Sequence, residues 1–594
     1  MSRFLRFGLP LALLSIASAC PDPTPTDDDD DDDALDDDDV SGDDDDSAAQ
    51  ADDDDAGPVA ETLNCAPAEA AIHSVWGAAG TVAFTAIGTW TDGTSEDVTA
   101  IGEWSVADGP GGEIAPDGTF TAPDRGAGVA VLQIDWEGLT TTCSVETYLE
   151  AVLDLVGDPA LEAAVAGAAT RLSDACAPYV LYPLDGSLIP ADFFSPEVQW
   201  IPGPGDDTWV ITFTTTFITL TAITQDPSWT PSGDAWWAIA NPDAGATIDL
   251  SVYGGDWDGA AFANGLCASS WPLHFWTAEW GEEGSVFYWT PNTQGLWQVD
   301  VGTETATPWM DQSIVGQCVG CHSVNLANPT LLAVTQGNGG YGANVITSDA
   351  DPTTPIAAGS SREASFSALD PTGTRVVRAN RGVLYLDDVL LDQNLATVPT
   401  TGWATHPNWS PDGQWLVYAS CDGASGGNDW SGYGCHLRVL EALAGDQWGP
   451  DTILALSPPG QDYYYPNFSP DSQWIAFNRR TGGADNYDEP TAELMLMPAS
   501  GGPPTLLAGA GGLPNITNSW PRWGPIEDDI GWIAFGSRRL YAQQTTGNAQ
   551  VWVAGVDLSV IASGLDGSYA PVWLPGQNTS TGNHTPAFIQ RDTD

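Results

Sequence analysis

The chain has 594 residues, of which 81 are acidic and 15 basic, so its formal net charge at pH 7 is −66. This charge excludes nucleic acid as a partner and disfavours an anionic membrane surface, because both are bound through clusters of Lys and Arg. Every basic residue is Arg, and the absence of Lys excludes Schiff-base chemistry and a phosphate-loop lysine. Abundant Gly (65), Pro (44) and Trp (27) predict a protein built of strands and turns.

Residues 1–20 are typical of an export signal, with Arg3 and Arg6 ahead of an apolar run over 9–16. The following Ala17-Ser18-Ala19-Cys20 resembles a bacterial lipobox, which implies cleavage before Cys20 and lipidation of its thiol. A larger aliphatic residue is commoner where Ala17 stands, and ordinary secretion with cleavage near Ala19 is the alternative. Residues 21–58 are rich in Asp and Pro, which predicts a disordered, extended tether rather than a calcium site.

The nine cysteines are an odd number for an exported protein. If Cys20 is lipidated, the remaining eight divide by their positions into three candidate disulfides and one close pair. Each candidate disulfide brackets a strand-rich or Gly-rich segment, and an oxidising compartment would allow it to form. The candidate disulfides are Cys65 with Cys143, Cys176 with Cys267, and Cys421 with Cys435, which leaves Cys318 and Cys321.

Residues 63–150 alternate strands with turns, and Asp92-Gly93 and Asp117-Gly118 are hairpin signals. The stretch TWTDGTSEDVTA over 89–100, followed by a Trp-containing strand and GTFTAP over 118–123, resembles a bacterial immunoglobulin-like domain of the second type. The resemblance implies a β-sandwich that acts as a spacer, with adhesion as the alternative role.

Residues 158–172 predict a helix, because Asp158 can cap it, Pro159 suits its first turn and Ala dominates the rest. A second β-rich module is predicted over 173–280. Its Pro-rich entry at 182–200 is similar to that of a fibronectin-like sandwich, and 209–223 alternate with many β-branched residues.

From about residue 284 to 590 the chain repeats itself. The segment HPNWSPDGQWLVYAS over 406–420 matches YPNFSPDSQWIAFNR over 465–479, and related copies begin near 364 and 520. Short strands and Pro-Asp turns at a period of 40 to 60 residues predict propeller blades. The Ser-Pro-Asp-Gly pattern resembles the TolB-like, WD40-like propellers. We expect six blades, one of them formed by 569–590 together with 286–301. The fold class predicted is therefore all-β, with two sandwich modules followed by a six-bladed propeller.

The motif Cys318-Val-Gly-Cys321-His322 is the sharpest chemical signal in the chain. Two thiols at this spacing can form thioethers with one heme, and the adjacent His can then ligate its iron. A short disulfide and a dithiol redox pair are the alternatives. The arrangement looks like that of the heme-bearing propeller proteins of bacterial envelopes, which implies thioethers on Cys318 and Cys321, the proximal ligand on His322, and a heme at the entrance of the propeller.

The second axial ligand of such a heme stays open in the sequence. Met310 and His274 are candidates, and an iron with an open or water-filled position is equally plausible. Because His406 stands where other repeats have Tyr465 and Trp520, we interpret it as a packing residue, and His436 likewise. A six-coordinate iron would indicate electron transfer, whereas an open iron would permit small-molecule chemistry.

The sequence thus predicts an outer-membrane lipoprotein, on the periplasmic or cell-surface side, that carries one heme c and transfers electrons. Its membrane contact would be the lipid anchor alone, and its partner would be a redox protein, for which a basic surface would suit the acidic chain, or a small molecule. A non-redox propeller scaffold with Cys318–Cys321 as a disulfide is the alternative. A heme-dependent oxidoreductase is the third hypothesis.

Overall fold

The computed structural model describes residues 57–240, 245–325, 327–328, 330–337, 341–348, 351–482, 489–543 and 547–590, without the side chains of 357–361. The predicted export signal, Cys20 and nearly all of the tether lie outside the described residues. The elements below belong to one compact unit, Pro58–Asp594. No helix in these ranges is long and apolar enough to cross a membrane.

The first β-rich segment consists of two small sheets and part of a large one. Its Asp-Gly turns lie where the sequence predicts them, since Asp92-Gly93 joins β4 to β5 and Asp117-Gly118 joins β7 to β8. Phe84, Phe120 and Leu132 are fully buried in its core. The small sheets are β1 (Ala60–Ala66), β4 (Thr85–Trp90) and β5 (Ser95–Asp97), and β3 (Thr81–Ala83), β8 (Thr119–Thr121) and β7 (Glu113–Ile114).

One long strand, β10 (Leu139–Asp154), links the two N-terminal segments. It pairs with β9 and β2 in its first part, and Leu149–Asp154 then run parallel to β16. The two predicted modules therefore share one eleven-stranded sheet instead of having separate ones. Its other strands are β2 (Glu69–Val75), β6 (Glu103–Asp108), β9 (Gly128–Trp136), β11 (Thr170–Leu172), β13 (Ser187–Pro190), β15 (Thr208–Thr214), β16 (Ile218–Thr224), β18 (Ile248–Gly255), β19 (Leu266–Ala268) and β20 (Leu273–Ala278).

The predicted helix over 158–172 is shorter in the structure. Helix α1 (Pro159–Gly167) begins as expected, with the Asp158 carboxylate accepting a hydrogen bond from the backbone N–H of Ala160 at 2.9 Å. It ends at Gly167 because Thr170–Leu172 form β11, which pairs with β19. A second helix of similar length, α2 (Gly233–Ala240), has eight residues.

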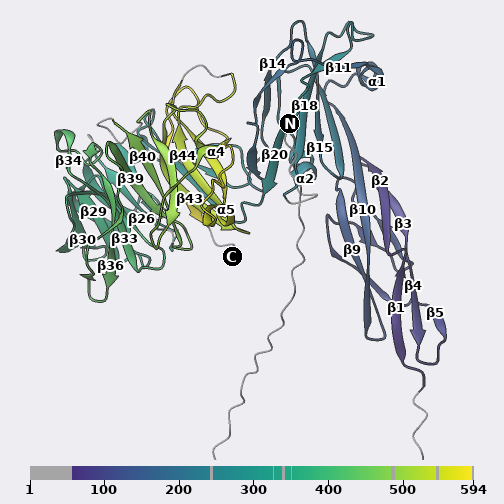
Figure 1. The fold of residues 1–594 in the computed structure, drawn as a ribbon, viewed down its shortest axis with the longest axis horizontal. Coiled ribbons are helices and arrows are strands. Elements are labelled where there is room, and N and C mark those ends of the chain that lie inside the picture. The colour runs from purple at the N-terminus through teal and green to yellow at the C-terminus, as the bar shows by residue number, and fades with distance from the viewer. Residues whose placement is uncertain are drawn as a thin grey trace, which may run out of the picture. The chain divides into compact units, whose positions relative to one another are not determined.

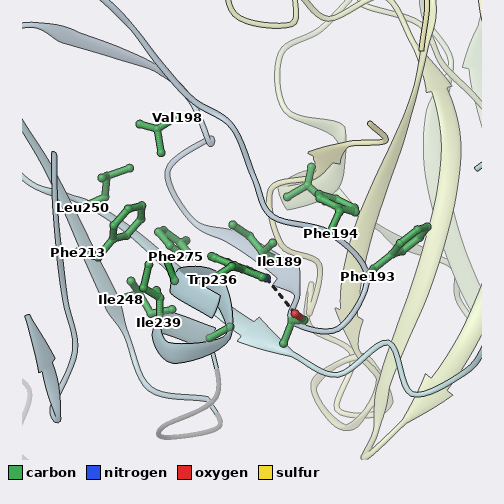
Figure 2. Packing of buried hydrophobic residues seen from close by; sticks show 14 of the residues in the cluster. Ile189, Phe193, Phe194, Val198, Phe213, Trp236, Ile239, Ile248, Leu250 and Phe275 are labelled. Atoms are coloured by element: carbon green, nitrogen blue, oxygen red, sulfur yellow. Dashed lines mark hydrogen bonds between the residues drawn. The ribbon is translucent and has the colours of Figure 1, made fainter. Parts of the chain in front are cut away.

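The second segment is held by a large apolar core. Trp236 of α2 packs on Phe275 of β20 and donates its indole N–H to the Ala191 carbonyl at 2.9 Å, as Figure 2 shows. The buried cluster continues to the propeller, where Trp280 contacts Trp532 with ring centroids 5.6 Å apart. A separate three-stranded sheet consists of β12 (Tyr179–Tyr182), β14 (Val198–Ile201) and β17 (Ser228–Trp229).

Six antiparallel sheets form the propeller, and several of their strands are labelled in Figure 1. This confirms the predicted fold class. Blade 1 contains β21 (Gly284–Thr290), β22 (Gly295–Asp300), β23 (Ala306–Met310) and β47 (His584–Gln590). Blade 2 contains β24 (Val319–Val324), β25 (Leu331–Gln336), β26 (Gly342–Ser348) and β27 (Ala357–Ala364). Blade 3 contains β28 (Phe366–Leu369), β29 (Arg375–Asn380), β30 (Val383–Asp388) and β31 (Gln393–Thr397).

Blade 4 contains β32 (Trp403–Trp409), β33 (Trp415–Cys421), β36 (His436–Leu443), β37 (Gln447–Trp448) and β38 (Thr452–Ala455), with the hairpin β34 (Gly423–Ala424) and β35 (Gly432–Tyr433) beside it. Blade 5 contains β39 (Gln461–Phe468), β40 (Trp474–Thr481), β41 (Glu493–Pro498) and β42 (Thr505–Leu506). Blade 6 contains β43 (Asn518–Glu527), β44 (Ile530–Ser537), β45 (Gln550–Asp557) and β46 (Val572–Trp573). The short helices are α3 (Gln312–Val315), η1 (Ser425–Gly427), α4 (Ala508–Gly511) and α5 (Leu558–Ala562).

The propeller is closed by strands from both ends of its segment. Strand β47 pairs with β21, so residues far apart in the chain complete blade 1. One detail of the predicted closure was wrong. The repeat copy at 569–576 contributes β46, which pairs with β45 and so completes blade 6 instead of blade 1.

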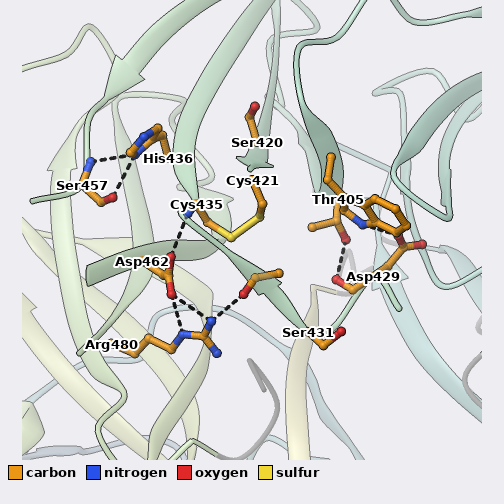
Figure 3. The surroundings of a disulfide bond; sticks show 12 residues. Thr405, Ser420, Cys421, Asp429, Ser431, Cys435, His436, Ser457, Asp462 and Arg480 are labelled. Atoms are coloured by element: carbon orange, nitrogen blue, oxygen red, sulfur yellow. Dashed lines mark hydrogen bonds and ion pairs between the residues drawn. A yellow bond between two sulfur atoms is a disulfide. The ribbon is translucent and has the colours of Figure 1, made fainter. Parts of the chain in front are cut away.

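Three disulfides lie in the described residues, joining Cys65 to Cys143, Cys176 to Cys267 and Cys421 to Cys435. The third closes the loop that carries β34 and β35, as Figure 3 shows. Beside it, the Asp462 carboxylate accepts a hydrogen bond from the backbone N–H of Cys435 at 2.8 Å and pairs with Arg480.

Candidate functional site

The first strands of the blades, with β47 taking this place in blade 1, surround the propeller axis in a closed ring, in which each contacts the next. Five of them contain a bulge at the same point of the repeat. The bulged residue has a positive φ in every case, which is uncommon for residues other than Gly and redirects the side chain. These residues are Cys321 (47°), His406 (52°), Tyr465 (52°), Trp520 (64°) and Thr585 (48°).

Side chains from this position meet one another across the blades. The ring centroids of His406 and Tyr465 are 4.2 Å apart, and those of Tyr465 and Trp520 are 4.0 Å apart. Phe366, which holds the same place in blade 3, lies 4.4 Å from His406. Cys321 packs against this aromatic cluster. The second thiol of the Cys-x-x-Cys-His motif therefore lies at the propeller axis.

The residue after the bulge distinguishes blade 2 from the others. It is Pro407, Pro466, Pro521 and Pro586 in four blades, whereas blade 2 has His322. The His322 side chain is 3% exposed, and neither ring nitrogen has a hydrogen-bond partner. Burial, with a contribution from the nearby Arg522 charge, lowers the pKa of His322 to about 3, so the imidazole is neutral at neutral pH. A buried imidazole without partners is costly unless a ligand satisfies it.

Both thiols of the motif are free, in contrast to the six disulfide-bonded cysteines of the described residues. Burial raises the pKa of the Cys321 thiol to about 12, and neighbouring Cys318 and Asp429 raise it further. Burial also raises the pKa of Cys318. The two thiols are thus close enough to influence each other, and both are protonated at neutral pH.

The two proposed distal ligands differ in their positions. Met310 is fully buried in the same apolar cluster as Val319, and its Sδ lies 3.9 Å from Nε2 of Gln336, the residue that pairs with Val319. The structure therefore brings Met310 close to the motif. In contrast, His274 lies on β20 and pairs with Asp249 at 2.6 Å, and no contact in the described part of the chain joins it to the motif.

The other two histidines considered in the sequence, His436 and His406, have different surroundings. His436 accepts a hydrogen bond from the backbone N–H of Ser457 at 3.1 Å and contacts its Oγ at 2.8 Å, which is a structural role visible in Figure 3. His406 packs at the axis, as the repeat alignment predicts. However, both of its ring nitrogens are buried without a partner, and burial together with Arg522 lowers its pKa.

Sequence reasoning missed Arg522, although the repeat contains a signal for it. Blades 4 and 5 have Asn408 and Asn467 two residues after the bulged position, and blade 6 has Arg522 there. The Asn side chains connect blades, because Asn408 Oδ1 accepts from the backbone N–H of Phe468 at 2.8 Å and Asn467 Oδ1 from that of Trp523 at 3.0 Å. A guanidinium has no acceptor and cannot make this bond.

Comparison with known proteins gives similarities of fold. No protein-family model matches the sequence, and no curated protein matches it. Solved structures that resemble it include TolB from Acinetobacter baumannii, which is 13% identical over 59% of this chain and 80% of its own length, with a TM-score of 0.35. A putative TolB from Agrobacterium tumefaciens is 13% identical over 53% of this chain and 100% of its own, with a TM-score of 0.29. A chain of a nidogen/laminin complex is 10% identical over 51% of this chain and 98% of its own, with a TM-score of 0.32. The six four- or five-stranded antiparallel sheets describe a β-propeller protein.

Proposed function

We propose that this chain is an exported protein that carries one covalently attached c-type heme on its propeller and transfers electrons through it. The observation that carries the proposal is the neutral, buried His322 imidazole, whose two nitrogens lack partners, beside two free thiols at heme-attachment spacing. None of the other cysteines of the described residues is left to pair with these thiols, because those six form three disulfides with each other.

The residues present fit such a group in their chemistry. Cys318 and Cys321 would hold the porphyrin through thioethers, and His322 would supply the proximal nitrogen in the neutral form that metal ligation requires. The aromatic cluster around Cys321 provides apolar surroundings of the kind that exclude water from a macrocycle. When bound, the heme would supply a one-electron couple at its iron.

Met310 is the better supported of the two distal candidates. Its thioether lies next to Gln336, within the cluster that packs on Val319 of the motif strand. A Met ligand would complete six-coordination, which favours electron transfer over small-molecule chemistry. The contact of its Nδ1 with the Asp249 carboxylate gives His274 a different role, in which it joins two strands of the eleven-stranded sheet.

The three disulfides support export, because such bonds persist in oxidising compartments. We further propose lipidation at Cys20 and an outer-membrane anchor, from which the Asp-rich tether extends the folded part of the chain. The strongly acidic chain would suit a basic redox partner. Association that is insensitive to salt would contradict that choice of partner.

The test is an absorption spectrum of the full chain from an exporting host whose c-heme maturation system is active. We expect a sharp α-band after dithionite reduction and a heme that stays attached through denaturing electrophoresis. Cys321→Ala and His322→Ala should remove or strongly alter the band, whereas Ser323→Ala, the next residue, should keep it. Carbon monoxide binding to the reduced protein would indicate an open iron, and its absence a filled sixth position.

A chain without heme, produced beside a reference cytochrome that matures normally, would overturn the proposal. The remaining function would then be that of a propeller scaffold, with Cys318 and Cys321 forming a disulfide. A thiol titration of the denatured heme-free chain would then show whether this disulfide forms, because it leaves no free thiol at Cys318 or Cys321 before reduction.

A further inference from the structure

Arg522 stands at a position of the repeat that has a defined structural use in blades 4 and 5. In blades 4 and 5 the corresponding Asn binds a backbone N–H of the following blade, at 2.8 Å from Asn408 and 3.0 Å from Asn467. Arg522 cannot replace this acceptor, so the substitution gives up a connection between blades. The chain has only 15 basic residues, so an Arg at this position indicates a role other than connecting two blades.

The contacts of Arg522 leave its charge unpaired. Its guanidinium donates to the Pro521 carbonyl at 2.9 Å and lies 5.3 Å from the Trp520 ring. No carboxylate forms an ion pair with it in the described residues. The other partly buried arginines of the propeller are mostly paired with carboxylates, as Arg378 is with Asp387, Arg438 with Asp451 and Arg480 with Asp462.

The surroundings of Arg522 include three aromatic side chains from successive blades. Trp520, Tyr465 and His406 form a continuous chain of ring contacts, which connects the guanidinium to the His406 imidazole. Burial and the Arg522 charge lower the pKa of His406, whose two ring nitrogens are buried without a partner.

The buried carboxylate near Cys321 serves other groups. Asp429 accepts hydrogen bonds from the backbone N–H groups of Arg381 and Gly382 and from the Trp403 indole, at 2.7 to 2.9 Å. Asp429 therefore accepts hydrogen bonds from a turn of blade 3, and no contact in the described residues joins it to Arg522. The Arg522 guanidinium therefore lies among aromatic rings, and no carboxylate of the described residues pairs with it.

We propose that Arg522 and His406 form a binding site for an anionic group, a carboxylate or a small oxyanion, at the propeller axis. The anion would accept hydrogen bonds from the guanidinium and from one imidazole N–H, which satisfies both groups. Two sources can supply this anionic group. One is a propionate of the heme in the proposed function, and the other is a free anion from solution. The site goes beyond the proposed function, because a free anion can bind a chain without heme.

The first arm of the test uses the full chain produced without heme maturation. Its thermal midpoint is measured in acetate and in inorganic phosphate, against chloride at equal ionic strength. If the anion is free, acetate or phosphate raises the midpoint. Arg522→Gln should then weaken binding roughly tenfold or more, whereas Arg522→Lys should retain part of it. Arg171→Gln is the matched control, since it removes the same charge from an exposed position and should leave the midpoint shift unchanged.

The second arm uses the heme-loaded chain. If the anion is a heme propionate, Arg522→Gln should shift the reduction potential to more negative values, because a positive charge near the heme is lost, and Arg171→Gln should not. Anion-independent midpoints together with an unchanged potential would overturn the site. If no heme attaches, the first arm alone decides, and a lack of acetate or phosphate binding there overturns it. Failure of the proposed function is therefore separate from failure of the anion site.

Discussion

Two arginines on neighbouring blades show how the same side chain is used in different ways. Arg480 of blade 5 is fully buried, and the Asp462 carboxylate neutralises it at 2.8 Å, as Figure 3 shows. Arg522 of blade 6 has no carboxylate and contacts only a neighbouring carbonyl and an aromatic ring in the described structure. Arg480 thus stabilises the fold, whereas Arg522 places an uncompensated charge at the axis.

In a repetitive fold, residues that differ from their counterparts in other blades indicate where a functional site lies. The matched Asn408 and Asn467 of blades 4 and 5 connect each of these blades to the next. His322 of blade 2 stands where four blades have Pro, and Arg522 of blade 6 stands where blades 4 and 5 have this Asn. The departures therefore identify the candidate site better than burial or composition does.

The largest effect is expected from breaking the neutralised pair. Asp462→Ala leaves the Arg480 guanidinium buried without its carboxylate, which should lower the free energy of unfolding by about 3–5 kcal/mol. Urea unfolding of the heme-free chain measures it. Asp462→Asn is the control, because it retains an acceptor for the backbone N–H of Cys435 and should lose less. A loss below about 1 kcal/mol for the Ala variant would show that the pair is not buried in solution.

A smaller effect is expected from the matched positions of blades 5 and 6. Asn467→Ala leaves the buried N–H of Trp523 without an acceptor and should cost about 1–3 kcal/mol. Arg522→Ala removes no acceptor and should change the free energy of unfolding by less than about 1 kcal/mol in a heme-free, anion-free buffer. Both variants are compared in the same urea titration. Equal losses would mean that Arg522 has a structural role after all.

The free energy of unfolding should depend on pH through His406, and a Phe at this position should remove that dependence. Blade 3 already has a Phe, Phe366, at the same place. Burial and the charges of Arg522 and Arg480 lower the pKa of His406 below its usual 6.5. As the pH falls, position 406 therefore takes up its proton in the unfolded chain before it does so in the folded chain. The contribution of the neutral His406 to stability is complete above about pH 6.5 and is lost as the pH falls below it. His406→Phe should remove up to about 1.4 kcal/mol of stability change per pH unit below that pH. Identical pH profiles for the variant and the wild type would contradict a buried neutral His406.

The smallest effect is expected for an exposed arginine pair. Arg125 contacts Asp234 with side chains that are 47% and 62% exposed. Asp234→Ala should therefore change the free energy of unfolding by less than about 1 kcal/mol, and added salt should reduce even that difference. A loss as large as that of Asp462→Ala would refute the distinction between buried and exposed pairs.

The sequence alone predicted the propeller and drew attention to its Cys-x-x-Cys-His motif. The Ser-Pro-Asp turns and aromatic-Pro-Asn triplets of blades 4 and 5 and the related copies near 364 and 520 are local signals, so they could be read from the residues themselves. Cys318, Cys321 and His322 were likewise recognised by spacing. The end of α1 at Gly167 and the shared strand β10 could not be predicted, because both depend on pairing with residues 70 to 100 positions away.

Only the tertiary structure decided which residues meet at the axis. Cys321, Phe366, His406, Tyr465 and Trp520 come from five blades, and closure of the ring of first strands brings them together. Packing of blade 1 on blade 2 placed Met310 beside the motif strand, and pairing of β18 with β20 placed His274 beside Asp249. The absence of a carboxylate beside Arg522 in the described residues is likewise known only from the tertiary structure. The neighbours of a charge in space come from distant parts of the sequence.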